Sequence, residues 1–440
     1  KLENKNIKVV PGPCMGRCDV APTVCVGKNY VDVANFDKVK KTIDEKNFDP
    51  FIPDYINLSS YKKKGGYEIA NKIKNGVISK KQVLDSLNES GLKGKGGAGF
   101  PTGKKWEIVS NYNGKKYVAV NGDEGEPGTF KDRSYLESDP HRFLEGALIA
   151  SYFINAQKVY IYMRDEYPTV IKILLDEINK MEDEEIIPKD FFIVRRGAGA
   201  YICGEESAMI ESIEGKRGLP RHRPPYVAEI GLFGCPTLTN NLETLFWVRD
   251  IIEKGAKWFA EKGSNGNKGF HSFSVSGRVK NPGVKVAPAG ITIQQLIDEY
   301  CDGMADGHTF KGYLPGGASG GILPATMNDI PLDYGSKELM DAGCFLGSAA
   351  VVVLSDHDNM KDVALNLLKF FEEESCGQCT PCRSGTEKTV KLMQEKNWNK
   401  EKLKDLSEVM AQASICGLGQ AATNPLNSVL KYFSNEITYD

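Results

Sequence analysis

Apolar and polar residues follow two alternating spacings between residues 71 and 260. Three short apolar runs have the length of buried strands: 117–120, 159–163 and 191–194. Three segments repeat apolar residues at intervals of three and four and predict helices: 78–92, 143–153 and 169–181. This alternation predicts an α/β core with a parallel, Rossmann-like sheet. Functional loops are then expected at the carboxyl ends of the strands, where 121–132 and 197–206 lie.

The first 70 residues have a different pattern. Residues 7–40 predict a short strand, a cysteine-containing loop, a hairpin and a helix, which amount to half of a small α/β domain. Residues 44–70 are polar and contain prolines, lysines and paired glycines, so they predict a linker. We therefore expect a partial domain over 1–45 and a linker over 46–70, ahead of the α/β domain at 71–260.

Beyond residue 260 the pattern predicts two further domains. A compact β-grasp domain is expected over 261–345, with strands and a helix at 273–280, 283–286 and 291–300. A buried strand is expected at 349–354. Four segments with helical spacing follow: 360–373, 385–394, 403–413 and 424–433. They predict a helical bundle over 346–440.

Residues 91–106 form a glycine-rich loop with the sequence GLKGKGGAGFPTGKKW. Glycine lets backbone N–H groups approach an anion closely, and Lys95, Lys104 and Lys105 add positive charge, so the loop predicts a phosphate site. The loop contains G-x-G-x-x-G, but a helix rather than a strand is expected before it, and no Walker A pattern is present. A flexible linker is the alternative, which Phe-Pro-Thr and Trp within the loop disfavour.

Composition narrows the classes of function. The 440 residues carry a net charge of −2 at pH 7, which gives no basic field of the kind that nucleic-acid binding needs. No apolar run reaches membrane-spanning length, so no direct membrane insertion is expected. Most of the eleven cysteines gather in two groups, at 14–25 and 376–416. This grouping is typical of metal ligands rather than of a disulfide framework, so a cytoplasmic location is expected.

Cys376, Cys379 and Cys382 stand in a C-x2-C-x2-C loop, which can hold three corners of a [4Fe–4S] cluster. Cys416, on a glycine-rich turn between two predicted helices, is expected to be the fourth ligand. A zinc site is the alternative, but zinc sites favour paired C-x2-C knuckles. The spacing therefore predicts an iron–sulfur cluster ahead of zinc.

Two acidic groups follow predicted strands. Asp123, Glu124 and Glu126 crowd into one loop, and Glu205 and Glu206 stand where a helix is expected to begin. A solvated loop and helix capping are the plain structural alternatives. Carboxylates also accept hydrogen bonds from ribose or ribityl hydroxyls and from a carboxamide. Facing a phosphate loop, they predict a nucleotide site with a basic end and an acidic end.

Five motifs together resemble one family, the NADH-binding flavoprotein subunits of complex I and their relatives in hydrogenases and formate dehydrogenases. The motifs are the cysteine loop and the segments 94–106, 121–133, 197–206 and 236–244. The resemblance implies FMN, NAD and one [4Fe–4S] cluster, with hydride transfer between NAD(H) and FMN and single-electron transfer between FMN and the cluster. It also implies an FMN-binding α/β domain, a soluble-ligand-binding β-grasp (SLBB) domain and a helical cluster domain.

The resemblance implies roles for individual residues. The FMN phosphate would contact Gly94, Gly96, Gly97 and Lys105. The ribityl chain and the ring would contact Asn121, Asp123 and Glu124. The rest of the flavin site would comprise Tyr201, Gly204, Glu205, Glu206, Asn240, Asn241 and Thr244. NAD would contact Phe100, Glu126, Glu206, Arg223 and Tyr226, with Glu126 and Glu206 as the catalytic residues.

The finer resemblance is to the β subunit of NAD-dependent molybdenum formate dehydrogenases, in the segments 218–227, 243–250 and 344–356. It implies a catalytic molybdopterin subunit and a thioredoxin-like [2Fe–2S] subunit as partners. The alternative is a diaphorase subunit of an NAD-linked or electron-bifurcating hydrogenase, with a hydrogenase subunit as partner, or of respiratory complex I. Outside the enzymes, the alternative is a zinc-stabilised β-grasp ligand-binding or scaffold protein.

The N-terminal cysteines Cys14 and Cys18 resemble half of the ligand set of a thioredoxin-like [2Fe–2S] domain found in partner subunits of this superfamily. Such a cluster needs four thiolates, and Cys25 is expected to lie in the core of a strand. One hypothesis is that residue 1 is not the biological N-terminus and that a missing segment carries the other pair. The alternative is a degenerate domain that is kept for docking and holds no cluster.

Overall fold

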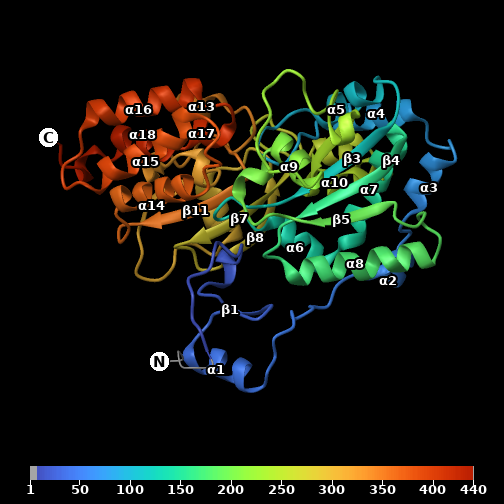
Figure 1. The fold of residues 1–440 in the computed structure, drawn as a ribbon, viewed down its shortest axis with the longest axis horizontal. Helices are drawn as coiled ribbons and strands as arrows, with labels where there is room; N and C mark the ends of the chain where they lie inside the picture. The colour runs from blue at the N-terminus through green and yellow to red at the C-terminus, as the bar shows by residue number, and fades with distance from the viewer. Residues whose placement is uncertain (1–6, 440) are drawn as a thin grey trace.

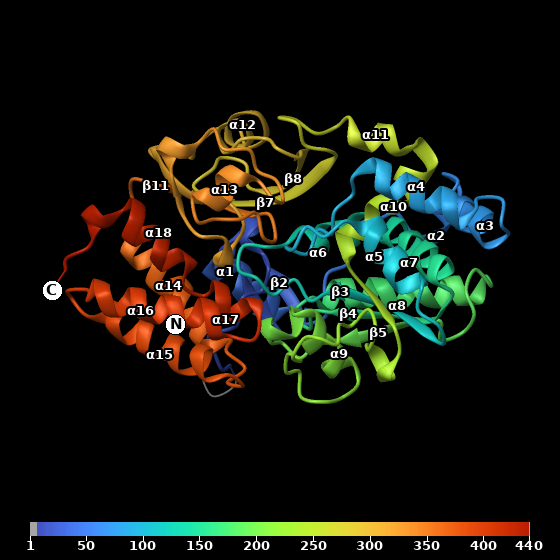
Figure 2. The same cartoon turned by 90° about the horizontal axis from the view of Figure 1, so that it is seen from above.

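The computed structural model describes residues 7–439. A parallel-sheet region and a helical region lie at opposite ends of the view in Figure 1, and an N-terminal segment lies below them. Figure 2 shows that a second sheet borders both of these regions along one side. Within the described residues, no helix is long and apolar enough to cross a membrane.

The first sheet is fully parallel, with the strand order β5-β4-β3-β6. Its strands are β3 (Lys116–Gly122), β4 (Ala156–Met163), β5 (Phe192–Arg196) and β6 (Thr237–Asn241). The chain moves outward from β3 to β5 and then returns to the other side of β3 with β6. This change of direction creates a crevice at the carboxyl ends of β3 and β6, where open α/β sheets bind their ligands.

Helices cover both faces of the first sheet. They are α4 (Lys80–Ser90), α5 (Thr102–Ser110), α6 (Lys131–Ser138), α7 (Pro140–Ile154), α8 (Pro168–Asp183), α9 (Glu206–Ile213), α10 (Leu242–Lys254) and α11 (Ala256–Ala260). Val118 and Val120 share a core with α7 and α10, whereas Ala119 shares a core with Met209 of α9. Alternate side chains of β3 thus pack on opposite faces.

Two short helices occupy part of the linker expected over 46–70, namely α2 (Leu58–Lys62) and α3 (Glu68–Lys74). Their apolar side chains are few but deeply buried. The Tyr61 hydroxyl donates a hydrogen bond to Glu145 Oε2 at 2.6 Å, and the Tyr67 backbone N–H donates to the same oxygen at 2.9 Å. The sequence did not predict this anchoring, because the stretch is polar in composition and its many lysines face water.

The second sheet has the strand order β10-β9-β11-β7-β8. Its strands are β7 (Phe270–Gly277), β8 (Gly283–Pro288), β9 (Phe310–Leu314), β10 (Leu323–Pro324) and β11 (Ala350–Ser355), and the helices α12 (Ile293–Gln295) and α13 (Lys337–Asp341) accompany it. β11 runs parallel to β7 and antiparallel to β9. The boundary expected between 345 and 346 therefore differs from the structure, because β11 lies inside this sheet. The helical region begins after Ser355.

The C-terminal helices are α14 (Met360–Glu373), α15 (Thr380–Gln394), α16 (Lys400–Ala413), α17 (Gly417–Ala421) and α18 (Asn424–Tyr432). α14 begins where the spacing predicts, because the Asn359 side chain accepts a hydrogen bond from the Asp362 N–H and caps the helix. Leu368 and Phe371 of α14 are buried in one core with Leu426 of α18. Leu314 of β9 and Leu354 of β11 belong to the same core, so the bundle packs against the second sheet.

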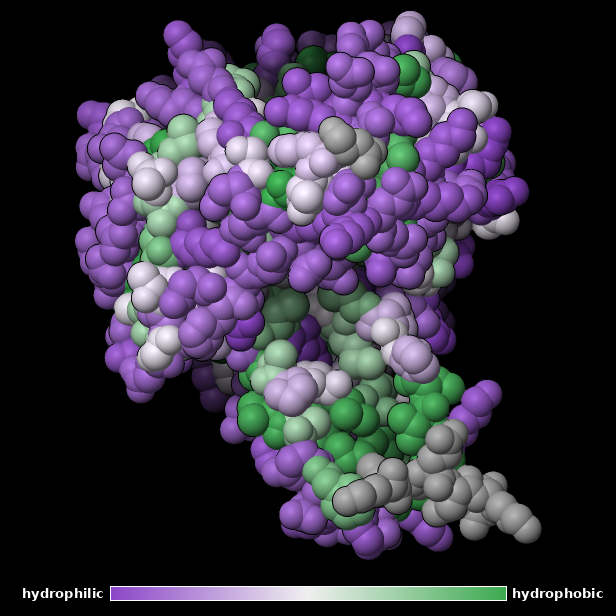
Figure 3. All heavy atoms as spheres, turned by 90° about the vertical axis from the view of Figure 1, so that its left-hand side faces the viewer, coloured by the Kyte–Doolittle hydropathy of each residue, from purple (hydrophilic) through white to green (hydrophobic). Residues whose placement is uncertain are grey.

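The N-terminal segment contains a hairpin of β1 (Val24–Val26) and β2 (Asn29–Val31), followed by α1 (Phe36–Asp44). The strand expected at 7–10 is not formed, since residues 8–15 adopt neither helix nor strand. Arg133 anchors the segment to the first-sheet region through an ion pair with Asp19 at 2.8 Å. Figure 3 shows apolar side chains gathered over this segment, where Val9, Val33 and Phe36 are exposed. An exposed apolar surface of this kind is typical of an interface.

Candidate functional site

A cleft of about 280 Å³ opens at the carboxyl ends of β3 and β6. All three regions supply its walls. The first-sheet region contributes the glycine loop at 95–97 and the loop after β3, and the second-sheet region contributes Ser319 and Ser348. The helical region contributes Leu418 and Ala421 of α17. The cleft therefore lies where the three regions meet.

The glycine loop presents bare backbone to the cleft. Its turn is held by the Gly94 N–H, which donates to the Phe100 carbonyl at 2.8 Å, and by the Lys95 N–H, which donates to Thr244 Oγ1 at 2.9 Å. Gly99 has a φ of +62°, and a Cβ built there would lie 2.5 Å from the Cβ of Tyr334. Only glycine fits this position. The exposed backbone N–H groups fit a phosphate group.

Positive charge lines the cleft through Lys131, which the sequence analysis did not single out. Burial lowers its pKa, but ion pairs with Asp132 at 2.8 Å and Glu243 at 3.2 Å outweigh burial and raise the pKa of Lys131 overall. Lys105 lies beside the cleft rather than in its wall. Its Nζ donates to Glu206 Oε1 at 2.8 Å.

The Lys95 side chain points away from the cleft and joins the glycine loop to the second-sheet region. Its Nζ donates to the Phe270 carbonyl at 2.6 Å and to His271 Nδ1 at 2.8 Å, while His271 Nε2 donates to Asp333 at 2.7 Å. Burial lowers the pKa of Lys95 to about 8, and burial with the nearby Lys95 charge lowers the pKa of His271 to about 4. The His271 ring is therefore neutral at pH 7 and can accept at Nδ1.

Three buried carboxyl groups follow β3. Glu124 accepts a hydrogen bond from the Asp132 N–H at 2.7 Å, and burial raises its pKa to about 7. Glu126 accepts from the Ser319 N–H at 2.9 Å, and burial raises its pKa as well. Asp123 borders a neighbouring cavity of about 110 Å³, where burial raises its pKa to about 8. Perturbed carboxyl groups of this kind concentrate at functional sites.

Glu205 and Glu206, the second acidic pair, have different roles. Glu205 caps α9, since its side chain accepts from the Ser207 and Ala208 N–H groups at 3.0 Å, as the capping alternative predicts. Arg223 forms an ion pair with Glu205 and lies 3.9 Å from Glu206. Glu206 is free of the capping bonds and lies between two cations, Lys105 and Arg223.

The structure brings half of the predicted flavin and NAD residues together in the wall of the cleft. Those that line the cleft are Gly96, Gly97, Asn121, Glu124, Glu126, Tyr201, Gly204, Glu205 and Asn241. Those that lie outside its wall are Gly94, Lys105, Asp123, Glu206, Asn240 and Thr244. Asn240 accepts a hydrogen bond from Trp106 Nε1 at 2.9 Å. Phe100 and Tyr226 lie outside the cleft and are 46% and 58% exposed.

Several cleft residues were missed by the sequence analysis, in equal numbers from the first-sheet and the second-sheet regions. They are Thr129, Lys131, Asp132, Ser319, Phe345 and Ser348. The glycines near these residues are a sequence signal that could have identified them. A Cβ at Gly317 would lie 2.8 Å from the Glu126 carboxyl carbon, so the run of glycines at 316–321 marks a close approach to the cleft.

The four predicted cluster ligands gather where α15 and α17 begin. Burial and the neighbouring thiols of Cys379, Cys416 and Cys376 together raise the pKa of Cys382 to about 11. Zinc would bring its sulfur ligands to about 3.8 Å from one another, given Zn–S bonds of about 2.3 Å. Among the described residues, no three cysteine sulfurs lie within 4.8 Å of one another. The C-x2-C-x2-C spacing of three of the four ligands fits a multi-iron cluster better than one zinc ion.

The segment that carries the cysteine loop contacts residues that line the cleft. The Tyr201 N–H donates to Glu374 at 2.8 Å, two residues before Cys376. The Tyr201 ring packs against Phe370, with ring centroids 5.1 Å apart. On the other side, α17 follows Cys416 directly and lines the cleft through Leu418. A group bound in the cleft therefore lies beside the four cysteines.

Two family models match the chain. The Nuo51 FMN-binding domain matches residues 87–250, and the NADH-ubiquinone oxidoreductase-F iron-sulfur binding region matches residues 362–440. An F-type subunit of NADH-quinone oxidoreductase in Rhizobium meliloti (strain 1021) is 40% identical over 400 residues, which cover 88% of this chain and 94% of the relative. The chain belongs to the family of these F-type subunits.

Another member and one solved structure agree with this membership. The F-type subunit of NADH-quinone oxidoreductase in Aquifex aeolicus (strain VF5) is 39% identical over 400 residues, covering 87% of this chain and 91% of that protein. A chain of the NAD+-reducing [NiFe]-hydrogenase in the H2-reduced state superposes with a TM-score of 0.84 at 30% identity, covering 96% of this chain and 76% of that chain.

Membership of this family makes the chain an NADH dehydrogenase subunit with FMN- and [4Fe–4S]-binding domains. The FMN-domain match includes the glycine loop and the carboxylates after β3, and the iron–sulfur match includes all four cysteines of the helical region. The zinc-stabilised scaffold alternative is thereby excluded.

Proposed function

We propose that the cleft holds FMN between an NADH site at its mouth and a [4Fe–4S] cluster on Cys376, Cys379, Cys382 and Cys416. The observation that carries this proposal is the shared wall, since Leu418 of α17 lines the cleft two residues after Cys416. FMN supplies the exchange of a two-electron hydride for single electrons. The chain's part is to orient the two cofactors and to keep water out.

Within the cleft, the backbone of Gly96 and Gly97 holds the phosphate, and Lys131 supplies a buried positive charge in the wall. Asn121 and Glu124 receive the ribityl hydroxyls and the ring. Asn121 is oriented for this by its side-chain N–H bond to the Gly204 carbonyl at 2.8 Å. Five predicted residues do not line the cleft but would hold the lining residues in place: Gly94, Lys105, Asp123, Asn240 and Thr244.

NADH would reach the flavin from the exposed side. Phe100 and Tyr226 expose aromatic faces outside the cleft, which suits stacking on adenine or nicotinamide. Arg223 offers a charge for the pyrophosphate. Glu126 and Glu206 would accept hydrogen bonds from NADH hydroxyls and from the carboxamide. Their role in hydride transfer is to set its geometry, because no proton need be moved by the protein.

Glu206→Gln is expected to raise the KM for NADH about ten- to hundredfold while FMN stays bound. The reason is the loss of a charge-assisted hydrogen bond, which is worth about 1.5–3 kcal/mol. Steady-state kinetics with an artificial acceptor, together with the FMN content, measure both effects. Glu107→Gln is the matched control, since Glu107 pairs with Lys104 on the exposed face of the neighbouring helix. Unchanged NADH kinetics with FMN retained would reject this role of Glu206.

The comparisons favour the alternative assignment over the formate dehydrogenase predicted from sequence. The relatives named above belong to NADH-quinone oxidoreductases, and the solved structure is a hydrogenase. The hydrogenase match covers 96% of this chain. The unmatched residues are fewer than those of the N-terminal segment, so the match extends into that segment. We therefore infer a diaphorase subunit of an NAD-linked hydrogenase.

The order β8-β7-β11-β9, with a parallel central pair, supports the expected β-grasp domain.

The partner subunits would distinguish the assignments. The exposed apolar side chains of the N-terminal segment suit a partner such as a thioredoxin-like [2Fe–2S] subunit. Affinity purification of the tagged chain from its native cells is expected to bring down a nickel–iron subunit. A molybdopterin subunit would restore the formate assignment, and membrane-bound quinone-reducing subunits would point to respiration.

Cys14 and Cys18 are proposed to share a [2Fe–2S] cluster with two thiolates from outside this segment. They lie beside each other, and Cys18 borders the same cavity as Gly128 of the loop after β3. Iron analysis of the full-length subunit is expected to give about six atoms per FMN, four in the cubane and two in the second cluster. About four atoms, with both thiols free for alkylation, would mean that this segment carries no cluster.

A further inference from the structure

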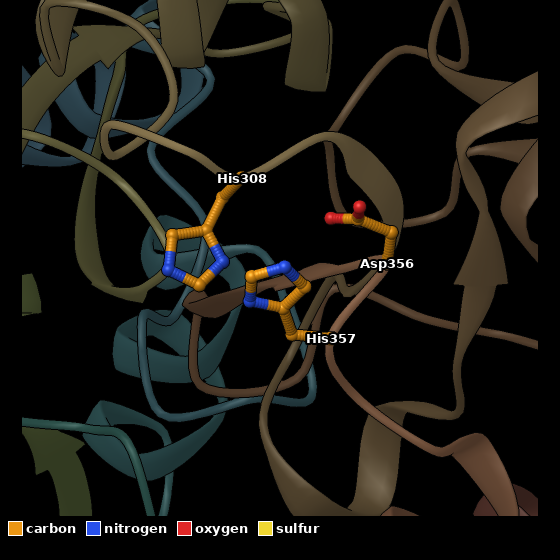
Figure 4. Close-up of side chains that lie close together, drawn as sticks. All are labelled: His308, Asp356 and His357. Atoms are coloured by element: carbon orange, nitrogen blue, oxygen red, sulfur yellow. The ribbon is translucent and has the colours of Figure 1, made fainter.

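Two histidines and an aspartate lie together outside the cleft, at one end of the second sheet. His308 precedes β9, and Asp356 and His357 follow β11. One ligand atom from each lies within 4.8 Å of the others. Figure 4 shows the two imidazole rings side by side, with the Asp356 carboxylate pointing toward them. We propose that this cluster binds a divalent transition metal ion, zinc foremost.

The backbone holds the two contributing segments in register. β9 and β11 pair antiparallel, with Ser355 opposite Phe310. Beyond that pair, the Asp356 N–H donates to the Thr309 carbonyl at 3.0 Å, and the Thr309 N–H donates to Asp356 Oδ1 at 2.8 Å. A metal ion would therefore find its ligands on a rigid sheet end rather than on independent loops.

The surrounding hydrogen bonds suit metal binding. His308 Nδ1 lies 2.9 Å from the hydroxyl of buried Ser355, which leaves Nε2 for the metal, as in most protein histidine sites. Asp358 is already engaged, since Arg278 pairs with its carboxylate at 2.7 Å. Within residues 7–439, no lysine or arginine forms an ion pair with Asp356, and its Oδ2 oxygen remains for a metal.

The ligand set selects the kind of metal. Two imidazoles and one carboxylate suit zinc, nickel or copper, whereas calcium and magnesium require oxygen ligands. A tetrahedral zinc ion would bring the ligand atoms to about 3.3 Å from one another, given bonds of about 2.0–2.2 Å. His357 is exposed and can close the remaining gap by side-chain rotation, while the hydrogen bond from Thr309 holds Asp356 in place. The fourth position stays open to water or to a partner's side chain.

Zinc counting on the holoprotein tests the proposal. The protein with FMN and cluster in place is dialysed anaerobically against zinc chloride with a weak chelator, and bound zinc is measured by mass spectrometry. The wild type is expected to hold one more zinc ion per chain than the double variant His308→Ala/His357→Ala. His222→Ala, which removes an exposed histidine elsewhere, is the matched control and should keep the wild-type count.

A single, conservative variant provides a second test if the double variant is unstable. Asp356→Asn keeps the side-chain shape and is expected to weaken zinc binding at least about tenfold, since even outer partners of a metal site contribute that much. Zinc should also raise the Tm of the wild type but not that of the variants. Equal zinc counts and equal zinc affinities in the wild type and in all variants would overturn the proposal.

Discussion

Cys416→Ala is expected to abolish the [4Fe–4S] signal in electron paramagnetic resonance while FMN remains bound. Cys416 supplies the proposed fourth thiolate, and a cubane held by three protein ligands is left with one open iron that water and oxygen attack. The flavin should survive because its proposed contacts come chiefly from the glycine loop and β3. The spectrum of the chemically reduced protein and its flavin absorbance measure the two effects.

Cys344→Ala is the matched control for this experiment. Cys344 is a buried cysteine whose sulfur lies 3.9 Å from the Ser428 hydroxyl, in the core between the second sheet and the bundle. Its replacement should lower stability and leave the cluster signal unchanged. A wild-type cluster signal in Cys416→Ala would refute the ligand assignment.

Gly99→Ala is expected to remove most of the bound FMN. Gly99 adopts a φ of +62°, which costs an L-residue about 1–2 kcal/mol. The added methyl would also lie 2.5 Å from the Cβ of Tyr334, an atom that cannot rotate away, and such overpacking costs about 1–3 kcal/mol. The loop must shift to relieve the contact, so the backbone N–H groups at Gly96 and Gly97 lose their alignment. Flavin released per chain on acid precipitation measures the loss.

Gly114→Ala separates backbone strain from the steric clash. Gly114 has a φ of +88°, and a Cβ there meets nothing within 4 Å. This variant should lower the Tm slightly and keep its FMN. Full FMN occupancy in Gly99→Ala would contradict the phosphate role of the loop.

Local features of the chain were predictable from sequence because they depend on neighbouring residues. The helix at 360–373 matches α14 since its apolar spacing and the Asn359 cap act within one turn or two. α4 likewise begins at the capping box of Ser79 and Gln82 and ends at Gly91 with a φ of +70°. The cysteine spacing predicted the iron–sulfur region for the same reason.

Features that depend on distant pairing were not predictable in this way. The strand at 349–354 was expected, but its apolar run could not tell that β11 pairs with β7 and β9 rather than with the bundle. The anchoring of 58–70 depends on two buried carboxylates far along the chain, Glu145 and Glu177, which accept hydrogen bonds from Tyr61 and Leu58. Ser319 and Ser348 reach the cleft only through the packing of the second sheet.

The most direct test of the flavin–cluster assignment is an anaerobic NADH titration of the purified chain, followed by absorbance and electron paramagnetic resonance. One FMN and one [4Fe–4S] cluster per chain are expected, with the flavin bleached by NADH and the cluster lost in Cys416→Ala alone. A chain that holds iron and flavin but shows no spectral change with NADH, or one that holds neither, would contradict the assignment.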